Sequence, residues 1–577
     1  MARSVNLSNG YMVLMKVLCL FGLRRLGGAS TSGALRSVST PLAGWFPALV
    51  ALAIPTFFLP NLVDAFILPR ASVVIAGACL GAGLAALVHG RPSLGALRWP
   101  LLAAAAAALL AFAFSSSWPL SLVGGYTRYE SLPMQLAYLG LLAVPVWLLR
   151  SELSRNAVIV AFVIGTALAS LEAIAQWWIH VPFRPDGNLG NANLLGALIA
   201  LAMPLSVARL LRFDWASPLW LLCSAVMVGG LIVSTSRGGA LATLAGCLAL
   251  AVFAARGRAA ALIGVAATAV VGLALLAILF SPLRNLNGDP GPTRLHLYPD
   301  AVRMISASPL VGWGEDATGL VFGRFLTGDW SPGVTFDRAH SGPLDLAATQ
   351  GLVGLVALGI VLVVLLRGLW RYRHAPPAHG SRPVRVGTIG AVGAACIAYT
   401  VWVAFNFDWA PATGPFWLLA GTGWSAVRSI QGEELPSANE LFERARPWGG
   451  LLRVVEALAL ALVAVGLAAL PILAEAWYSE GRSDLAVQVD PLQSQYHRAF
   501  GERLIGQGSQ QQGLSELRLA ARLGSTDPSL YVELGDEELR TGDVAQARAD
   551  YQMALTIDPY WLPAKQRLAA NGGLATA

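Results

Sequence analysis

Long apolar segments recur along almost the whole of this chain of 577 residues. A helix that crosses a lipid bilayer needs about 20 predominantly apolar residues. By that criterion the sequence predicts thirteen candidate helices, at residues 43–60, 72–89, 99–114, 133–149, 156–179, 192–211, 217–234, 238–255, 259–280, 343–366, 386–406, 412–429 and 451–473. Only 13% of the residues are charged, whereas soluble domains carry about 25%. We therefore expect an all-α protein, a polytopic transmembrane helix bundle of about 12–13 spans in a lipid bilayer.

Arginines in the connecting segments predict how this bundle is oriented. Basic loops stay on the cytoplasmic side of a bilayer. Every second connection is basic, and the arginines concerned are Arg24, Arg25, Arg36, Arg91, Arg98, Arg150, Arg155, Arg209, Arg212, Arg256, Arg258, those from Arg367 to Arg385, Arg428 and those at 443–453. The remaining connections, among them the long loop at residues 281–342, are therefore predicted to be extracytoplasmic. Because one missed helix would break the alternation, it also supports the number of spans.

Composition divides the chain into four parts. Residues 1–40 contain an apolar patch too short to span a membrane, and we expect a cytoplasmic leader there, with a signal peptide as the alternative. Residues 41–430 form the predicted membrane domain, residues 451–473 the last transmembrane helix, and residues 475–577 a polar extracytoplasmic domain. The five cysteines lie in apolar runs without metal-ligand spacing, so we predict no metal and no cofactor. Arginines at membrane edges explain the net charge of +7, so nucleic acid is not an expected partner.

The C-terminal part resembles tetratricopeptide repeats. Asp-Pro recurs at 490–491, 527–528 and 558–559, a spacing close to the period of about 34 residues in such repeats. Residues 528–559 carry Leu534, Gly535, Gly542, Ala547, Tyr551, Ala554 and Leu555 at the positions that the repeat pattern requires. The resemblance is weaker over residues 491–527. It implies a short α-solenoid that binds a protein partner outside the membrane.

His340 is the candidate catalytic base. It ends the sequence Asp337-Arg338-Ala339-His340 in the long loop, directly before the tenth apolar segment. An imidazole, with an ordinary pKa near 6.5, can take a proton from an attacking hydroxyl group. Asp337 and Arg338 are possible supports, and Asp337 or Asp345 could orient the ring. The alternative is a histidine at the membrane interface with a structural hydrogen bond.

Isolated arginines in the outward-facing connections are candidate anion ligands. Arg128, Arg184 and Arg237 break the charge alternation and lie near predicted helix ends, where desolvation of a cation is costly. The alternative is that each extends to the lipid headgroups. Asn191 and Asn193, in the sequence Gly-Asn-Leu-Gly-Asn-Ala-Asn, could add a hydrogen-bonding rim at a helix start. A turn followed by a helix cap explains these residues equally well.

Four motifs together resemble the O-antigen ligase and polymerase superfamily. They are GNLGNANLLGALIALAMPL at 187–205, STSRGGALATLAG at 234–246, TRLHLYPDAVRMISASPLVGWG at 293–314, and the following DRAHSGPLDLAATQGLVGL. They occur in the family's order, and the last two are the most specific. The resemblance covers roughly residues 45–430. Many members have Asn after the loop histidine, whereas this chain has Ser341. The family's residue roles around the acceptor therefore apply less closely to this chain.

The resemblance implies a membrane glycosyltransferase of the GT-C type in a bacterial cytoplasmic membrane. Such enzymes transfer a glycan from an undecaprenyl-diphosphate carrier to an acceptor hydroxyl at the outer face, by an inverting, metal-independent displacement. By the same resemblance, His340 is the base, and Arg237, Arg184, Arg294 and Arg128 contact the diphosphate. Acceptors in the family are lipid A core, the growing glycan or a protein serine. We favour a ligase over a polymerase or a protein O-oligosaccharyltransferase, because the long loop with its terminal histidine matches the ligases best.

Two readings of another class remain. A transporter or flippase for a lipid-linked glycan would also need many helices, but it should carry ionisable residues in mid-span. Here Glu172 is nearly the only carboxylate inside a predicted span, while the other charges lie in loops. An assembly factor with a degenerate membrane core, acting through its repeats, is the other reading. Loss of activity on replacement of His340 discriminates against both.

Overall fold

The computed structural model describes residues 43–88, 91–280, 291–375, 387–431 and 447–570. Every regular element within these ranges is a helix, so the predicted all-α class is confirmed. The predicted leader at residues 1–40 lies outside the described residues, as does the start of the long loop, residues 281–290.

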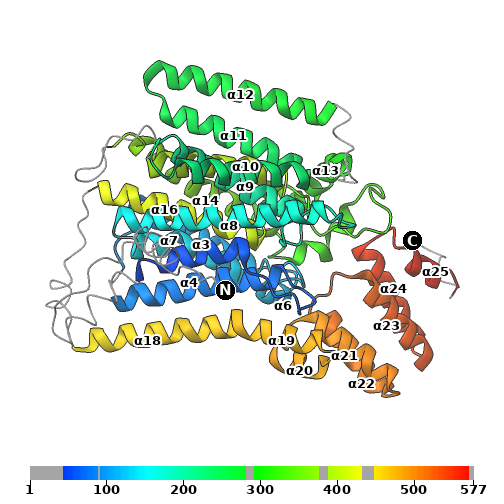
Figure 1. Cartoon of the computed structure of the whole chain (residues 1–577). Helices are drawn as coiled ribbons and strands as arrows, with labels where there is room; N and C mark the ends of the chain where they lie inside the picture. Colours follow the sequence, from blue (N-terminus) through cyan, green and yellow to red (C-terminus); the bar gives the residue numbers. More distant parts are fainter. Residues whose placement is uncertain (1–42, 89–90, 281–290, 376–386, 432–446, 571–577) are drawn as a thin grey trace, which may run out of the picture.

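A helix occupies each of the thirteen predicted apolar segments. These helices are α3 (Phe46–Thr56), α4 (Ile67–Val88), α5 (Arg98–Ala113), α7 (Leu132–Leu148), α8 (Glu152–Trp178), α9 (Ala192–Leu210), α10 (Ser217–Ser234), α11 (Arg237–Ala254), α12 (Gly257–Phe280), α14 (Gly342–Tyr372), α15 (Thr388–Val403), α16 (Ala410–Ile430) and α18 (Pro447–Ala464). A short π-helical turn joins α18 to α19 (Leu470–Ser479). They lie side by side as one bundle (Figure 1).

Nine helices in the described ranges are long and apolar enough to cross a membrane, and α3, α7 and α15 are apolar but shorter. The chain is thus a multi-pass membrane protein. The predicted total of 12–13 spans depends on these shorter helices and on α16.

Helix α9 lies at the centre of the bundle, between α8, α10, α11 and α15. Most of its length is buried, and small residues allow its neighbours to approach closely. A Cβ atom on Gly239 of α11 would lie only 2.6 Å from the Cα atom of Gly196 in α9. Close backbone contact through small residues is typical of helices packed within membranes.

One end of the bundle, which we call the loop end, carries the described part of the long loop. Helix α13 (Gly291–Ala307) and residues 308–341 lie there, beside the short helix α6 (Trp118–Val123) (Figure 1). The loop is therefore partly helical, and it has an apolar core of its own. Leu297, Ala301, Met304, Ala317, Phe322, Phe336 and Ala339 form that core. A loop with a packed core can hold side chains in defined positions.

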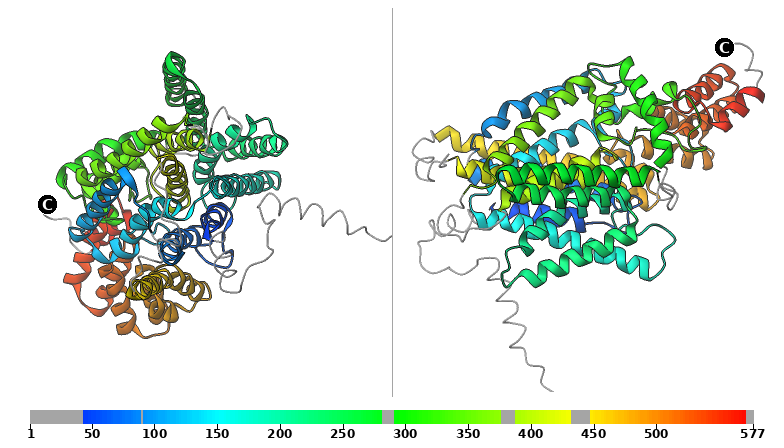
Figure 2. Two further views of the ribbon diagram at one scale, coloured as in Figure 1. Left: turned by 90° about the vertical axis from the view of Figure 1, so that its left-hand side faces the viewer. Right: turned by 90° about the horizontal axis from the view of Figure 1, so that it is seen from above.

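The C-terminal helices lie at the same end (Figures 1 and 2). They are α20 (Ser483–Val489), α21 (Ser494–Gly506), α22 (Gln510–Arg522), α23 (Pro528–Thr541), α24 (Val544–Ile557) and α25 (Leu562–Ala570). Helices α21 and α22 pair as one hairpin and α23 and α24 as another, within the bounds of the two expected repeats. Asp527 caps α23 by accepting a hydrogen bond from the Ser529 amide, and Gly535 packs against the ring of Tyr551. That these hairpins are tetratricopeptide repeats stays a prediction.

A buried carboxylate fastens the C-terminal helices to the membrane domain. Glu475 in α19 is 0% exposed. It accepts hydrogen bonds from the amide of Asp64 (2.8 Å) and the hydroxyl groups of Tyr126 (2.8 Å) and Tyr496 (2.8 Å). These donors come from the loop before α4, the loop after α6 and the first C-terminal hairpin. One side chain therefore joins three separate parts of the chain.

We expect Glu475→Ala to loosen this junction, because three donors would lose their acceptor. Buried donors without a partner cost about 1–3 kcal/mol each, so the free energy of unfolding should fall by about 3 kcal/mol or more. Thermal unfolding in detergent and limited proteolysis between α19 and α20 measure the effect. Glu480→Ala is the control, since Glu480 is exposed at the end of the same helix. Unchanged cleavage in the Glu475 variant would contradict the assignment.

Candidate active site

The backbone around His340 has an unusual conformation that a neighbouring carboxylate holds in place. His340 has φ +56°, a left-handed conformation that is uncommon for residues other than glycine. Asp345, in the first turn of α14, accepts hydrogen bonds from the amides of Ala339 (2.7 Å) and Ser341 (3.1 Å), the residues on either side. Strained backbone that is over-determined by its surroundings is common at functional sites. Asp345 therefore positions the backbone of His340 and not its ring.

The ring of His340 packs edge-on against Phe407, with the ring centroids 5.1 Å apart. Burial lowers the pKa of His340 to about 4, and the nearby positive charge of Arg294 adds to this shift. The imidazole is thus neutral near pH 7. Among the described residues, no group donates a hydrogen bond to it or accepts one from it, so the ring is available to a substrate hydroxyl group.

Phe407 brings three cationic or basic side chains together. The guanidinium groups of Arg128 and Arg338 lie 5.0 Å and 5.3 Å from its ring centroid, and His340 packs on it as well. Arg128 also lies 5.0 Å from the ring of Trp409. Attraction between a guanidinium group and an aromatic face favours this arrangement. Sequence reasoning missed Phe407, because an aromatic residue in the short connection between α15 and α16 has no distinguishing pattern.

Arg128 and Arg338 each also pair with a carboxylate. Arg128 Nε donates to Asp337 at 2.9 Å, and Arg338 forms an ion pair with Asp316. Burial alone would raise the pKa of Asp337, but Arg128 and Arg338 outweigh it and hold that pKa below its usual range. Asp337 is therefore ionised and paired with Arg128. Like Asp345, it makes no hydrogen bond to the imidazole ring of His340 within the described ranges.

Asp316 links residues 337–341, which we call the His340 segment, to the loop after α6. Its Oδ2 accepts hydrogen bonds from the amides of Gly125 (2.8 Å) and Glu130 (3.0 Å), while its Oδ1 binds Arg338. Asp316 itself has φ +53°. Burial raises its pKa, and Arg338 opposes that shift. The sequence contains no motif that singles out Asp316, so this residue too was missed.

Two other arginines predicted from the sequence lie near Phe407. Arg294 in α13 donates to the carbonyl of Phe405 (2.8 Å), two residues from Phe407. Arg237 is the first residue of α11, and a Cβ atom on the next residue, Gly238, would lie 3.0 Å from Nδ2 of Asn406. Both therefore border residues 405–407. The structure thus brings Arg128, Arg294, Arg338 and His340 together, with the start of α11 beside them.

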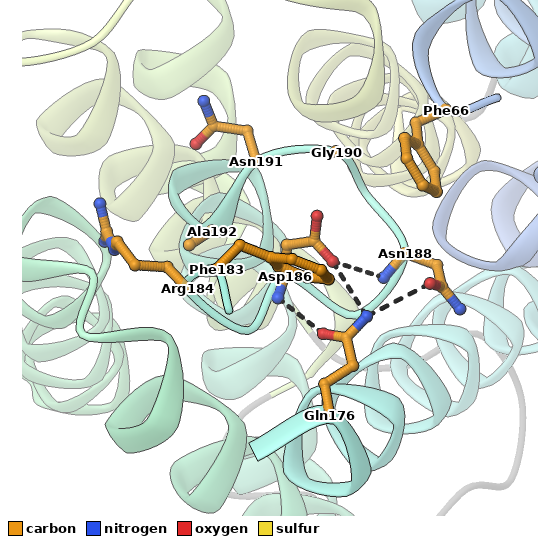
Figure 3. A pocket seen from close by; sticks show the side chains of 9 residues that line it. All are labelled: Phe66, Gln176, Phe183, Arg184, Asp186, Asn188, Gly190, Asn191 and Ala192. Carbon is orange, nitrogen blue, oxygen red and sulfur yellow. Dashed lines mark hydrogen bonds between the residues drawn. The ribbon is translucent and has the colours of Figure 1, made fainter. Parts of the chain in front are cut away.

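The structure places Arg184, Asn191 and Asn193 outside the group of residues around Phe407. Arg184 donates to the carbonyl of Ser234 (3.0 Å) and contacts Oδ1 of Asn193 (3.5 Å). The same Oδ1 accepts from the hydroxyl of Ser236 (3.1 Å), which precedes Arg237. Asn191 caps α9 by accepting from the amide of Asn193 (2.8 Å). Arg184 and Asn191 also line an open pocket (Figure 3).

A mostly apolar cavity of about 150 Å³ begins directly below the His340 segment. It lies between α5, α7, α14, α15 and α16, and Gly342 and Asp408 are among its lining residues. The cavity extends into the bundle along leucine, alanine and valine side chains of these helices. In the part of the chain that the structure describes, no cluster of three histidine, cysteine or carboxylate side chains could hold a metal ion.

One family model matches part of the chain. Residues 222–359 match the family model described as O-Antigen ligase. The matched region runs from α10 into α14 and includes Arg237, Arg294, Arg338 and His340. No curated protein matches the chain. The match covers less than half of the chain. Over these residues the chain is similar to O-antigen ligases, and at the family level this similarity supports a membrane enzyme of the glycosyltransferase type.

Proposed function

We propose that the protein transfers a glycan from undecaprenyl diphosphate to an acceptor hydroxyl group at the outer face of the bacterial cytoplasmic membrane. The observation that carries this proposal is a neutral His340 with a fixed backbone, surrounded by Arg128, Arg294 and Arg338. A neutral base and several guanidinium groups are what a displacement at a sugar diphosphate requires. We favour a ligase, and the alternatives within the superfamily are a polymerase and a protein O-oligosaccharyltransferase.

In the proposed reaction, the acceptor hydroxyl gives its proton to His340 while its oxygen attacks the anomeric carbon of the donor sugar. The new carbon–oxygen bond forms on the face opposite the diphosphate, so the configuration inverts. The bond between the anomeric carbon and the diphosphate oxygen breaks, and the electron pair stays with the diphosphate. Arg294, Arg237 and Arg128 stabilise that charge, since guanidinium groups match phosphate oxygens in pairs. The proton on His340 then leaves to water, and no metal step is needed.

The cavity below Gly342 supports a lipid-linked donor. It is lined mainly by apolar side chains of five helices, so it suits the first isoprene units of a polyprenyl chain. A polyprenyl diphosphate held there would have its charged group at the His340 segment. The extracytoplasmic placement of the loop end belongs to this proposal, and the alternation of basic connections supports it.

The test is glycan transfer in proteoliposomes with purified lipid-linked donor and a choice of acceptors. Addition of one preformed glycan to lipid A core indicates a ligase, products of increasing length indicate a polymerase, and a glycosylated protein indicates an O-oligosaccharyltransferase. If the native protein moves the donor across the bilayer without transferring its glycan, it is a transporter and the proposal is wrong.

The pH dependence of transfer gives a separate check on His340. Because its pKa lies near 4, the base is neutral above that pH and protonated below it. We expect kcat/KM to stay constant from about pH 7 down to about pH 5, and to fall only as pH approaches 4. An ordinary histidine would lose activity below about pH 6.5. Arg294→Gln should move the acid limb to higher pH, since a positive charge beside the ring is removed. If kcat/KM of the native enzyme already falls near pH 6.5, the buried environment assigned to His340 is wrong.

A further inference from the structure

The open pocket that Arg184 borders (Figure 3) has a volume of about 500 Å³, and none of residues 337–341 lines it. It lies at the loop end, between the end of α8, residues 183–191, the start of α9, and Phe66 before α4. No step of the proposed transfer uses its lining residues.

One amide side chain organises the floor of the pocket. The carbonyl oxygen of Gln176 accepts from the amides of Asp186 (2.9 Å) and Gly187 (3.0 Å). Its amide nitrogen donates to Oδ1 of Asp186 (3.1 Å) and of Asn188 (3.2 Å). Buried Arg70 adds a hydrogen bond to the Asn188 carbonyl (2.8 Å). Because Gln176 and Asp186 are only 5% and 7% exposed, the floor is preorganised, which lowers the entropic cost of binding a ligand.

Several polar atoms of the lining residues form no hydrogen bond with another described residue. They are the second carboxylate oxygen of Asp186 and the amide nitrogens of Asn188 and Asn191. Two aromatic residues complete the lining, and one of them, Phe183, is 54% exposed. A pyranose ring presents hydroxyl groups that both donate and accept around an apolar C–H face. Planar amides, a carboxylate and the exposed ring of Phe183 match that chemistry.

A continuous set of contacts joins the pocket to the reaction site. Arg184 reaches from the pocket to Asn193, which accepts from Ser236 beside Arg237. The start of α11 in turn borders residues 405–407, and His340 packs against Phe407 within this stretch. A sugar in the pocket would therefore lie beyond the diphosphate ligands and away from the reacting carbon.

We propose that this pocket is a subsite for a sugar unit of the lipid-linked donor glycan, remote from the bond that is broken. The proposal rests on the proposed transfer function and adds to it the recognition of an extended glycan. It predicts that the enzyme distinguishes donors by sugars that take no part in the chemistry.

The experiment measures binding and transfer separately. The binding probe is the oligosaccharide released by mild acid from lipid-linked donor of the same cells, titrated into purified native protein and variants by calorimetry. Phe183→Ala should weaken binding about five- to tenfold, and Asp186→Asn about threefold to tenfold, since one acceptor becomes a donor. Phe183→Tyr should stay within about twofold of the native protein. Phe114→Ala is the matched control, because Phe114 is also exposed but does not line the pocket.

In transfer assays, Phe183→Ala should raise the KM of the full-length donor by the same factor and leave that of a single-sugar donor unchanged. Titration with acceptor glycan distinguishes the two possible sources of sugar: tighter binding of acceptor than of donor glycan overturns the proposal. The proposal is also overturned if Phe183→Ala and Asp186→Asn bind the donor oligosaccharide as tightly as the native protein does, or if the native protein does not bind it. If the native protein binds the oligosaccharide through Phe183 and transfers no glycan, the subsite stands and the proposed function fails.

Discussion

Replacement of His340 by alanine is expected to lower kcat/KM for glycan transfer by about 100- to 10,000-fold, the range that a positioned general base contributes. His340 packs on Phe407 together with Arg128 and Arg338, and burial lowers its pKa and so keeps it in the basic form. The residual rate would come from the arginines, which still hold the leaving group. KM for the donor should change little, since the base acts on the acceptor. Initial rates in proteoliposomes, normalised to inserted protein, give the measurement.

His180→Ala is a close control for this experiment. His180 is exposed at the same end of the bundle and also has a left-handed backbone, with φ +57°. Any effect of placing alanine at such a backbone conformation should therefore appear in both variants, while loss of catalysis should appear only at position 340. An alanine variant at 340 that keeps half of the native rate would remove His340 from the mechanism.

Replacement of Arg338 by methionine is expected to have the largest effect on stability. Arg338 is 7% exposed and pairs with the buried carboxylate of Asp316. Removing one partner of a buried ion pair leaves an uncompensated charge, which costs about 3–5 kcal/mol. Methionine keeps much of the aliphatic volume, so the loss should report charge rather than packing. Thermal unfolding in detergent measures it. Transfer should fall as well, because the segment that carries His340 loses its ion pair with Asp316, the residue that binds the loop after α6.

A second substitution separates these two effects. Adding Asp316→Asn to the Arg338 variant removes the unpaired charge, and asparagine tolerates the left-handed backbone at this position. The double variant should regain at least half of the lost stability while transfer stays low, a non-additivity that shows direct coupling of the two residues. Arg303→Ala is the control, because Arg303 is half exposed and its partner Asp300 also binds Thr327 and Trp330. Strictly additive effects of the two substitutions would show that the pair is not coupled.

The positions of the helices could be predicted from the sequence because their causes are local. The length of an apolar run and the charges that bound it decide where a helix can lie in a bilayer. Asp527 followed by proline likewise marks the start of α23 in the sequence. The same applies to His340 as a candidate, since a histidine just before an apolar helix is visible without a structure. Its role as the base remains a prediction.

The environment of His340, in contrast, depends on contacts between distant parts of the chain. Arg128 meets Asp337 across more than 200 positions, and Phe407 packs against both Arg128 and His340 from another connection. No local pattern encodes such contacts, because they follow from how whole helices pack. For the same reason the sequence left open whether Asp345 orients the imidazole ring, and the structure shows that it binds the backbone on either side.

The sequence by itself thus determined the membrane-embedded helices, their order and the candidate base, since hydrophobic length and charge act residue by residue along the chain. Only the tertiary structure decided which arginines surround that base, which carboxylates hold them, and that Arg184 borders a separate pocket. These features depend on burial and on distances of a few ångströms, and both arise only when helices distant in sequence pack together.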